Sequence, residues 1–199
     1  WFDFIRGLSA LLVCATHLRA AMFVNFSDVK VPSFFTKIFY FATGLGHQAV
    51  IIFFVLSGFF VGGLVIKKQK KFSFNEYIFA RLVRLWVVLV PMLLLTFIVD
   101  KFIFNHLPVL FSGEHLLILN SGPTEQYSLS LITFIGNVFF LQTLATPVFG
   151  SNGPLWSLAN EFWYYILFPL LMIVFGRIPA KLTTRIMLAC LSLLIIYFF

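Results

Sequence analysis

The first apolar segment, residues 2–23, carries four ionisable side chains, those of Asp3, Arg6, His17 and Arg19. Such groups are costly inside a membrane span, so each one suggests a function. His17 follows Arg6 by eleven positions, which places the two within about 20° around a helix and about 16 Å apart along it. A neutral histidine in a partly dry cavity is suited to take a proton from a hydroxyl group. We therefore interpret the Arg6–His17 face as a candidate catalytic face.

Each of these residues also has an ordinary explanation. Arg6 can extend its charge to the membrane interface, and His17 can bond a neighbouring helix. Arg19 is expected to anchor the outer edge of the span. Asp3 lies one helical turn before Arg6 and can pair with it.

A second group of cations lies in the stretch KKQKKFSFNEYIFARLVRL. Arg81 and Arg84 are three residues apart and share a face if this stretch is helical. Together with the nearby lysines they can mark a cytoplasmic loop and touch anionic lipid. Alternatively, they can clamp the phosphates of a cytosolic donor such as a coenzyme A thioester, because arginine binds phosphate through two nitrogens.

The stretch GPLWSLANEFWYYILFP places Glu161 just after Trp156 and Ser157, at the expected start of an aromatic-rich span. The ordinary explanation is an exposed acid at a helix start, where the helix dipole favours it. In a cavity, Glu161 could orient a histidine, pair with an arginine or bind sugar hydroxyls. No stretch of the sequence resembles a metal-ligand cluster, so no metal is expected.

The composition predicts the elements that must position these side chains. Of the 199 residues, 61% are hydrophobic and only 11% are charged, whereas soluble domains average about 45–50% and about 25%. The chain is therefore predicted to be an all-α, polytopic transmembrane bundle within the lipid bilayer. The net charge of +7 is explained by cytoplasmic loops, and no nucleic-acid partner is expected.

A span needs roughly 20 residues, and we expect about six spans or partial spans in a single domain over 1–199. They are predicted at about 4–24, 44–66, 85–104, 131–146, 162–175 and 186–199.

The basic loop at 67–84 orients the chain, because it holds six Lys and Arg residues. It predicts a cytoplasmic amino terminus and outer loops at 25–43 and 105–130. The short segment 131–146 can either cross or re-enter. We favour re-entry, because it keeps the basic loop around 176–185 on the cytoplasmic side; its non-helical backbone would then have to be buried.

Four motifs resemble the membrane acyltransferase-3 family. FDFIRGLSALLVCATH matches its Asp-x-x-Arg-Gly opening, in which an arginine is followed eleven residues later by a histidine. FFVLSGF at 53–59 is similar to its second-helix signature, and Arg81 and Arg84 match its Arg-x-x-Arg pair. WSLANEFWYYILFP at 156–169 is similar to its Trp-Ser-Leu-x-x-Glu stretch. The proline that often follows the second arginine of the pair is delayed here to Pro91.

The resemblance implies an acyltransferase that transfers groups other than aminoacyl groups (EC 2.3.1). It would move an acetyl or other short acyl group from cytosolic acyl-CoA, in the first place acetyl-CoA, to a hydroxyl of an extracytoplasmic carbohydrate. That acceptor would be a cell-surface polysaccharide, lipopolysaccharide or glycan. The expected location is the bacterial inner membrane.

The resemblance also implies roles for individual residues. Arg81 and Arg84 would hold the phosphates of the donor. His17 would act as general base or carry the acyl group, and Arg6 would stabilise charge at the thioester carbonyl. Glu161 would orient the acceptor or the histidine. The candidate acceptor contacts are Trp156, Ser157 and Asp3.

A different class stays open, namely a carrier or channel that uses the Arg6–His17 face as a path for ions or solutes. The chain begins at Trp1 and ends inside an apolar run at Phe199, whereas family members usually have about ten spans. We therefore expect an amino-terminal portion of a longer protein, incomplete at the carboxy terminus.

Overall fold

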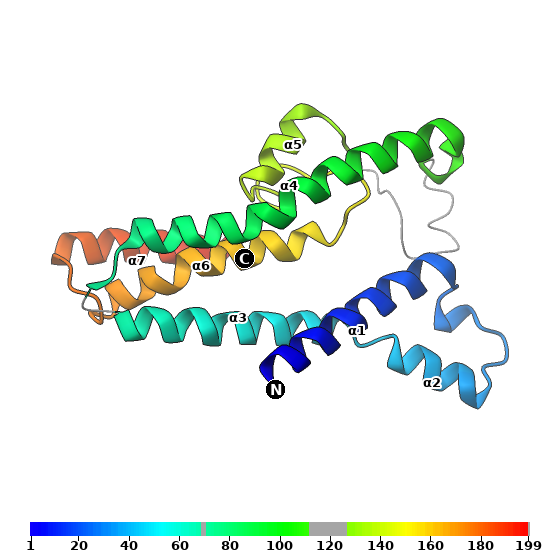
Figure 1. Ribbon diagram of the computed structural model, residues 1–199, viewed down its shortest axis with the longest axis horizontal. Coiled ribbons are helices and arrows are strands. Elements are labelled where there is room, and N and C mark those ends of the chain that lie inside the picture. Colours follow the sequence, from blue (N-terminus) through cyan, green and yellow to red (C-terminus); the bar gives the residue numbers. More distant parts are fainter. Residues whose placement is uncertain (69–70, 112–126, 199) are drawn as a thin grey trace. The chain divides into compact units, whose positions relative to one another are not determined.

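The computed structural model describes residues 1–68, 71–111 and 127–198 (Figure 1). Its α-helices are α1 (Phe2–Met22), α2 (Phe34–Ala42), α3 (Gly46–Lys68), α4 (Phe74–His106), α5 (Leu131–Val138), α6 (Leu155–Val174) and α7 (Leu182–Phe198). Two short 3₁₀ helices, η1 (Phe26–Asp28) and η3 (Pro108–Phe111), follow α1 and α4. Within these described ranges no strand forms, and only two isolated bridges occur. The all-α prediction is confirmed.

Four helical segments of the described chain are long and apolar enough to cross a membrane. They are α1, the stretch Phe34–Lys68 that holds α2 and α3, α4, and α6. The apolar helix α7 has 17 residues and is shorter than a usual span. The prediction of a helical membrane protein is therefore confirmed.

Three predicted boundaries were wrong. The expected outer loop at 25–43 contains α2, whose first turn is capped where Ser33 Oγ accepts a hydrogen bond from the backbone N–H of Thr36 at 3.1 Å. The expected loop at 67–84 is mostly helical, because α4 begins at Phe74 and no glycine or proline interrupts it before Pro91. The expected span at 162–175 begins earlier, directly after Pro154. Most of the predicted outer loop at 105–130 lies outside the described residues.

The described residues fold into two compact units. Unit 1 comprises Trp1–Leu56 and Ile98–Tyr127, and unit 2 comprises Ser57–Phe97 and Ser128–Phe199. In unit 1, the end of α1 is tied to the chain around α2 by two hydrogen bonds. Thr16 Oγ1 donates to the carbonyl of Thr43 at 2.7 Å, and Tyr40 Oη donates to the carbonyl of Val24 at 2.7 Å.

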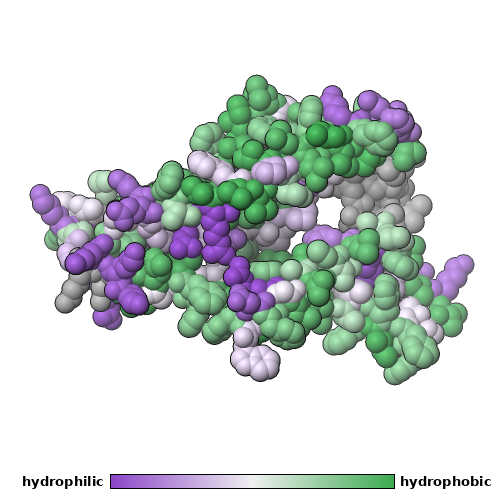
Figure 2. Space-filling view, in the orientation of Figure 1, coloured by the Kyte–Doolittle hydropathy of each residue, from purple (hydrophilic) through white to green (hydrophobic). Residues whose placement is uncertain are grey.

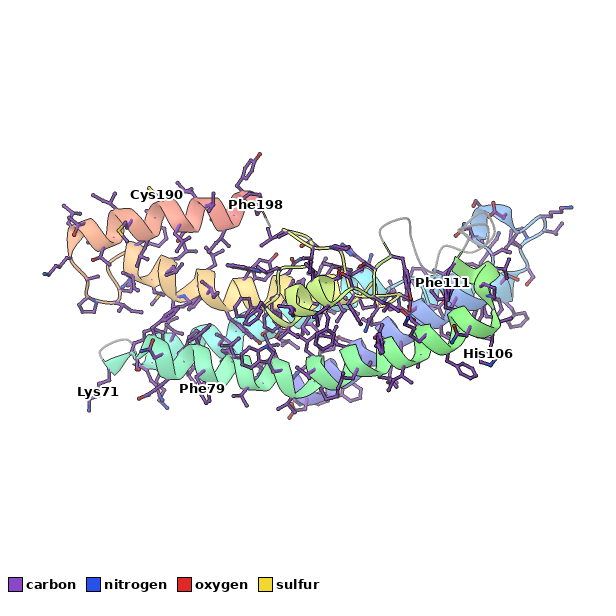
Figure 3. The ribbon with its side chains drawn as sticks, turned by 90° about the horizontal axis from the view of Figure 1, so that it is seen from above. Lys71, Phe79, His106, Phe111, Cys190 and Phe198 are labelled. Atoms are coloured by element: carbon purple, nitrogen blue, oxygen red, sulfur yellow. The ribbon has the colours of Figure 1, made fainter. Side chains whose placement is uncertain are left out.

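Unit 2 contains the hydrophobic core. Side chains from α3, α4 and α6 meet there with those of the segment after α5. Its buried members are Val61, Val65, Tyr77, Leu85, Leu89, Leu93, Phe140, Phe149, Leu155, Ala159, Tyr165 and Ile178. Within this unit α7 packs beside α6, as Figures 1 and 3 show.

The basic ends of four helices gather at one end of unit 2. The turn from α3 into α4 and the loop from α6 into α7 both lie there, and Figure 2 shows hydrophilic side chains clustered over this end. Ile178 of the second loop belongs to the same buried core as Val65 and Tyr77 beside the first turn. Thus α4 leads away from this basic end and α6 returns to it, so both basic loops lie at the same end of unit 2.

The segment 131–146 does not form a span. Its helix α5 has 8 residues, about 12 Å in length, against about 30 Å of hydrocarbon. The chain after α5 turns back through Phe140 and Thr143, both at positive φ. Full crossing by this helix is therefore excluded, whereas entry into the bilayer stays a prediction.

Buried amides hold the non-helical chain after α5. Asn137 donates to the carbonyls of Thr133 and Pro147 at 2.8 and 3.0 Å, and its carbonyl oxygen accepts from the backbone N–H of Phe149 at 3.1 Å. Gln142 donates to the carbonyl of Leu155 at 2.9 Å. Such internal bonding is the condition for irregular backbone away from water.

Candidate functional site

Three of the four motif segments meet in unit 2 around the carboxylate of Glu161. Ser57 Oγ donates to Glu161 Oε1 at 2.9 Å and lies 2.8 Å from Tyr165 Oη. Tyr165 Oη donates to the same carboxylate oxygen. Ser57, Glu161 and Tyr165 are called the hydroxyl–carboxylate cluster below.

The positions of these side chains follow from their helices. Glu161 and Tyr165 are four residues apart on α6, so their side chains lie on the same face. Ser57 comes from α3. Tyr77 of α4 completes the contact among the three helices, because its phenol donates to the backbone carbonyl of Tyr165 at 2.9 Å.

The two hydroxyl groups fix the orientation of the carboxyl group. Ser57 Oγ and Tyr165 Oη both donate to the same oxygen of Glu161. A carboxyl group held in this way can orient a bound hydroxyl or a neighbouring side chain.

Arg81 lies against this cluster. Its guanidinium carbon is 5.7 Å from the ring centroids of both Tyr77 and Tyr165, which is within the range of cation–π attraction. Its Nε is buried without a hydrogen-bond partner. Arg84, three residues further along α4, is exposed.

The cluster lies inward from the basic end of unit 2. Arg81 follows the start of α4 by seven residues, Tyr165 precedes the end of α6 by nine, and Ser57 precedes the end of α3 by eleven. At 1.5 Å per residue, these positions are about 10–17 Å along their helices from that end. The motif residues therefore form a polar group within reach of a ligand that is held at the basic end.

The fourth motif lies in unit 1, on α1. The predicted pairing of Asp3 with Arg6 is confirmed, with Arg6 Nη1 3.8 Å from Asp3 Oδ1. The side chain of Arg6 is 39% exposed and that of Asp3 is 98% exposed, so the pair is weak. His17 is exposed, and the buried position on this helix is Ser9. The catalytic roles of Arg6 and His17 stay predictions.

Trp156 and Ser157 lie in the first turn of α6. Trp156 is exposed, and Ser157 Oγ donates to the backbone carbonyl of Pro154 at 2.9 Å, which closes that turn. Glu161 was expected at the start of its helix, but it lies in the second turn. Binding of the acceptor by Trp156 and Ser157 stays a prediction.

The sequence analysis did not name two members of the site, Ser57 and Tyr165. Tyr165 lies in the stretch expected to be aromatic-rich and is only 2% exposed. Ser57 lies in the FFVLSGF motif. The available signals were the four-residue spacing from Glu161 to Tyr165 and a hydroxyl in the middle of an apolar span. Across the described ranges, no group of three His, Cys, Asp or Glu side chains could hold a metal ion.

Comparisons with known proteins agree with the motif pattern. The sequence model of the acyltransferase-3 family, described as an acyltransferase domain, matches residues 1–199. The chain is 29% identical over 186 residues to acyltransferase MdmB of Streptomyces mycarofaciens, covering 89% of this chain and 40% of that protein. It is 28% identical over 173 residues to an O-acetyl transferase of Shigella phage Sf6, covering 83% of this chain and 44% of that protein.

A third relative is an uncharacterized protein of Haemophilus influenzae, with 30% identity over 130 residues, which is 62% of this chain and 48% of that protein. The chain thus spans less than half the length of these relatives. No solved structure matches the chain significantly.

Proposed function

This chain belongs to the acyltransferase-3 family of acyltransferase domains, and on that premise we propose that it is a membrane O-acyltransferase of class EC 2.3.1. Its donor is a cytosolic acyl-CoA, with acetyl-CoA the first candidate. Its acceptor is a hydroxyl of an extracytoplasmic carbohydrate, such as a cell-surface polysaccharide, lipopolysaccharide or glycan. The protein would lie in the bacterial inner membrane with its amino terminus in the cytoplasm. The observation that carries the proposal is the meeting of three motif segments at the hydroxyl–carboxylate cluster.

The basic end of unit 2 is the proposed entrance for the donor. By the positive-inside rule this end faces the cytoplasm, where acyl-CoA is made available. Exposed Arg84 and the buried, unpartnered Nε of Arg81 offer nitrogens that can bind phosphate in pairs. With its phosphates held there, the thioester arm of the donor would extend inward along α4 toward the cluster.

The chemistry needs a base, a site for negative charge and a leaving thiol. In the proposed reaction, His17 takes the proton of the acceptor hydroxyl while the hydroxyl oxygen attacks the thioester carbonyl. Arg6 stabilises the negative charge on that carbonyl oxygen. The C–S bond then breaks, and the proton passes from His17 to the thiolate, which releases coenzyme A. The role of Glu161 is to orient the acceptor or the histidine, supported by the two hydroxyls that hold its carboxylate.

The first test removes the proposed base. Membranes from cells that overproduce the protein are given labelled acetyl-CoA, and transfer to the cell-surface polysaccharide is counted. Replacing His17 with alanine should lower transfer about 10²–10⁴-fold, the usual contribution of a positioned base, with the protein still inserted. His106→Ala is the matched control, because this histidine is exposed and, among the described residues, its hydrogen bond is to the carbonyl of Phe102 on its own helix. Wild-type transfer by the His17 variant would end the general-base proposal.

The second test concerns donor binding. Arg84→Gln should raise the KM for acetyl-CoA about tenfold with little change in kcat, because a charge-assisted contact to phosphate is lost from the ground state and transition state alike. Arg84→Lys should recover part of this loss. Lys67→Gln, at the same basic end, serves as the control and should change KM less than threefold. An unchanged KM in Arg84→Gln contradicts the phosphate role.

The same assays also test the alternative, in which the protein is a carrier or channel. A carrier or channel would move solute across the membrane without acyl-CoA and would label no polysaccharide. Solute movement that is independent of the donor and lost in the His17 variant would therefore replace the enzyme proposal.

A further inference from the structure

Unit 1 contains an open cavity that the proposed reaction does not use. It has a volume of about 710 Å³ and is lined by Arg19, Asn25, Phe26, Lys37, Tyr40 and Phe41. All six residues belong to the end of α1, the connection that follows it, and α2. Lys37, Tyr40 and Phe41 share one face of α2, because they are three and four residues apart.

The charge of this cavity is positive. Arg19 and Lys37 line it, and among the described residues that line it there is no carboxylate. Asp28, in the same connection, is engaged by the hydroxyl of Ser27 at 3.2 Å. A cavity with two cations and no acid attracts anionic ligands.

Arg19 is held in a fixed position but keeps free hydrogen-bonding capacity. Its guanidinium carbon lies 5.1 Å from the ring centroid of Tyr40, whose hydroxyl is fixed by the carbonyl of Val24. Its Nε is buried and has no hydrogen-bond partner. A buried donor left without a partner is unfavourable, and a bound oxyanion would supply the missing acceptor.

Three of the four other residues that line the cavity are aromatic, and the fourth is Asn25. Phe26 packs against Tyr40 with their ring centroids 5.3 Å apart, and the Phe41 side chain is largely exposed. Aromatic faces beside two cations suit a ligand that has an anionic group next to a sugar ring or an acyl chain.

We propose that this cavity is a binding site for a phosphate group, carried by a sugar or by a lipid, with Arg19 and Lys37 as its ligands. Arginine binds the phosphate oxygens through paired nitrogens, and lysine adds a point charge on the opposite helix. The site acts by binding alone, so the proposal does not depend on acyl transfer.

The test uses the purified protein in nanodiscs of neutral phosphatidylcholine without acyl-CoA. One arm titrates glucose 1-phosphate against uncharged glucose by calorimetry. The other arm adds dioleoylphosphatidic acid to the nanodisc and counts retained lipid by native mass spectrometry. Phosphate-dependent binding in the first arm identifies a sugar phosphate as the source, and binding in the second identifies a lipid headgroup.

Matched variants connect the binding to the cavity. Arg19→Gln and Lys37→Gln should each weaken binding about tenfold, which corresponds to about 1.4 kcal/mol. Arg19→Lys should weaken it less than Arg19→Gln. Lys30→Gln is the control, because this exposed lysine lies in the same connection without lining the cavity.

Two results would overturn the proposal. One is the absence of phosphate-dependent binding in both arms by wild-type protein that unfolds cooperatively. The other is an equal loss of affinity in Lys30→Gln, which would mean that only the general field of the cations acts. Loss of acyl transfer in any variant has no bearing on either result, so this proposal and the proposed function can fail separately.

Discussion

The hydroxyl–carboxylate cluster predicts a measurable coupling between Ser57 and Tyr165. Tyr165→Phe removes the phenol oxygen but keeps the ring, so the core packing and the contact with Arg81 are retained. Ser57→Ala removes the other hydroxyl with little change in volume. Each change takes one donor from the Glu161 carboxylate. Hydrogen bonds to a charged group contribute about 1.5–3 kcal/mol, and we expect each variant to lose stability in that range.

The double variant should lose less than the sum of the two single losses. Ser57 Oγ and Tyr165 Oη are 2.8 Å apart and share one carboxylate oxygen. When one hydroxyl is already missing, removal of the other breaks fewer contacts. Residues in one hydrogen-bond network show interaction energies of about 0.5–3 kcal/mol in such cycles, and we expect a value near the middle of that range.

The assay is the free energy of unfolding in mixed detergent micelles, measured for the wild type, both single variants and the double variant. Tyr197→Phe is the matched tyrosine control, since this side chain is 83% exposed on α7. Ser27→Ala is the serine control, because this serine is exposed and its hydroxyl bonds the neighbouring Asp28 at 3.2 Å. Both controls should change stability by less than about 0.5 kcal/mol.

Additivity within about 0.3–0.5 kcal/mol would refute the reasoning. It would mean that Ser57 and Tyr165 do not share a network in the folded protein. Equal destabilisation by the exposed Tyr197 variant would refute it as well, since a general effect of losing a phenol would then explain the result.

Three further predictions concern other parts of the chain. Gly46→Ala should destabilise unit 1 by about 1–3 kcal/mol, because the new Cβ would lie 2.6–2.9 Å from side-chain atoms of Thr16; unchanged thermal unfolding contradicts this. Arg185→Ala should cost about 1.5–3 kcal/mol in the same assay, because two of its nitrogens bond one carbonyl at the end of α6 at 2.7 and 3.1 Å. Burial, and then the charge of Asp100, raise the pKa of Tyr127 to about 12. Stability from this tyrosine should therefore be present below pH 10 and lost as the pH rises toward 12, and an ultraviolet titration in which all tyrosines ionise near pH 10 contradicts it.

Much of the fold follows from local features of the sequence. Apolar stretches of span length predicted α1, α3, α4 and α6, because helix formation in lipid depends on hydropathy and length alone. Boundaries were less predictable. The start of α4 at Phe74 lies eleven residues before the expected span, because amphipathic helix continues where hydropathy has already fallen.

The candidate site was predictable in its charged members and not in its neutral ones. Arg81 and Glu161 stood out because a charge near a span needs an explanation. Ser57 and Tyr165 did not stand out, because hydroxyl groups are common in membrane spans. Their importance became clear from their hydrogen bonds to Glu161. His17 is the opposite case. It was selected because it is an ionisable residue in an apolar helix, and its surroundings in the folded protein played no part in that choice.

Local properties of the sequence suffice to identify a helical membrane protein of the acyltransferase-3 family, because hydropathy, helical spacing and motif residues are properties of neighbouring positions. The hydrogen bond from Ser57 to Glu161, 104 positions further along the chain, is known from the folded structure alone. The folded structure also decided that α5 turns back and that both basic loops lie at one end of unit 2. Such pairings depend on which helix faces pack together, and that choice is made by the whole buried core.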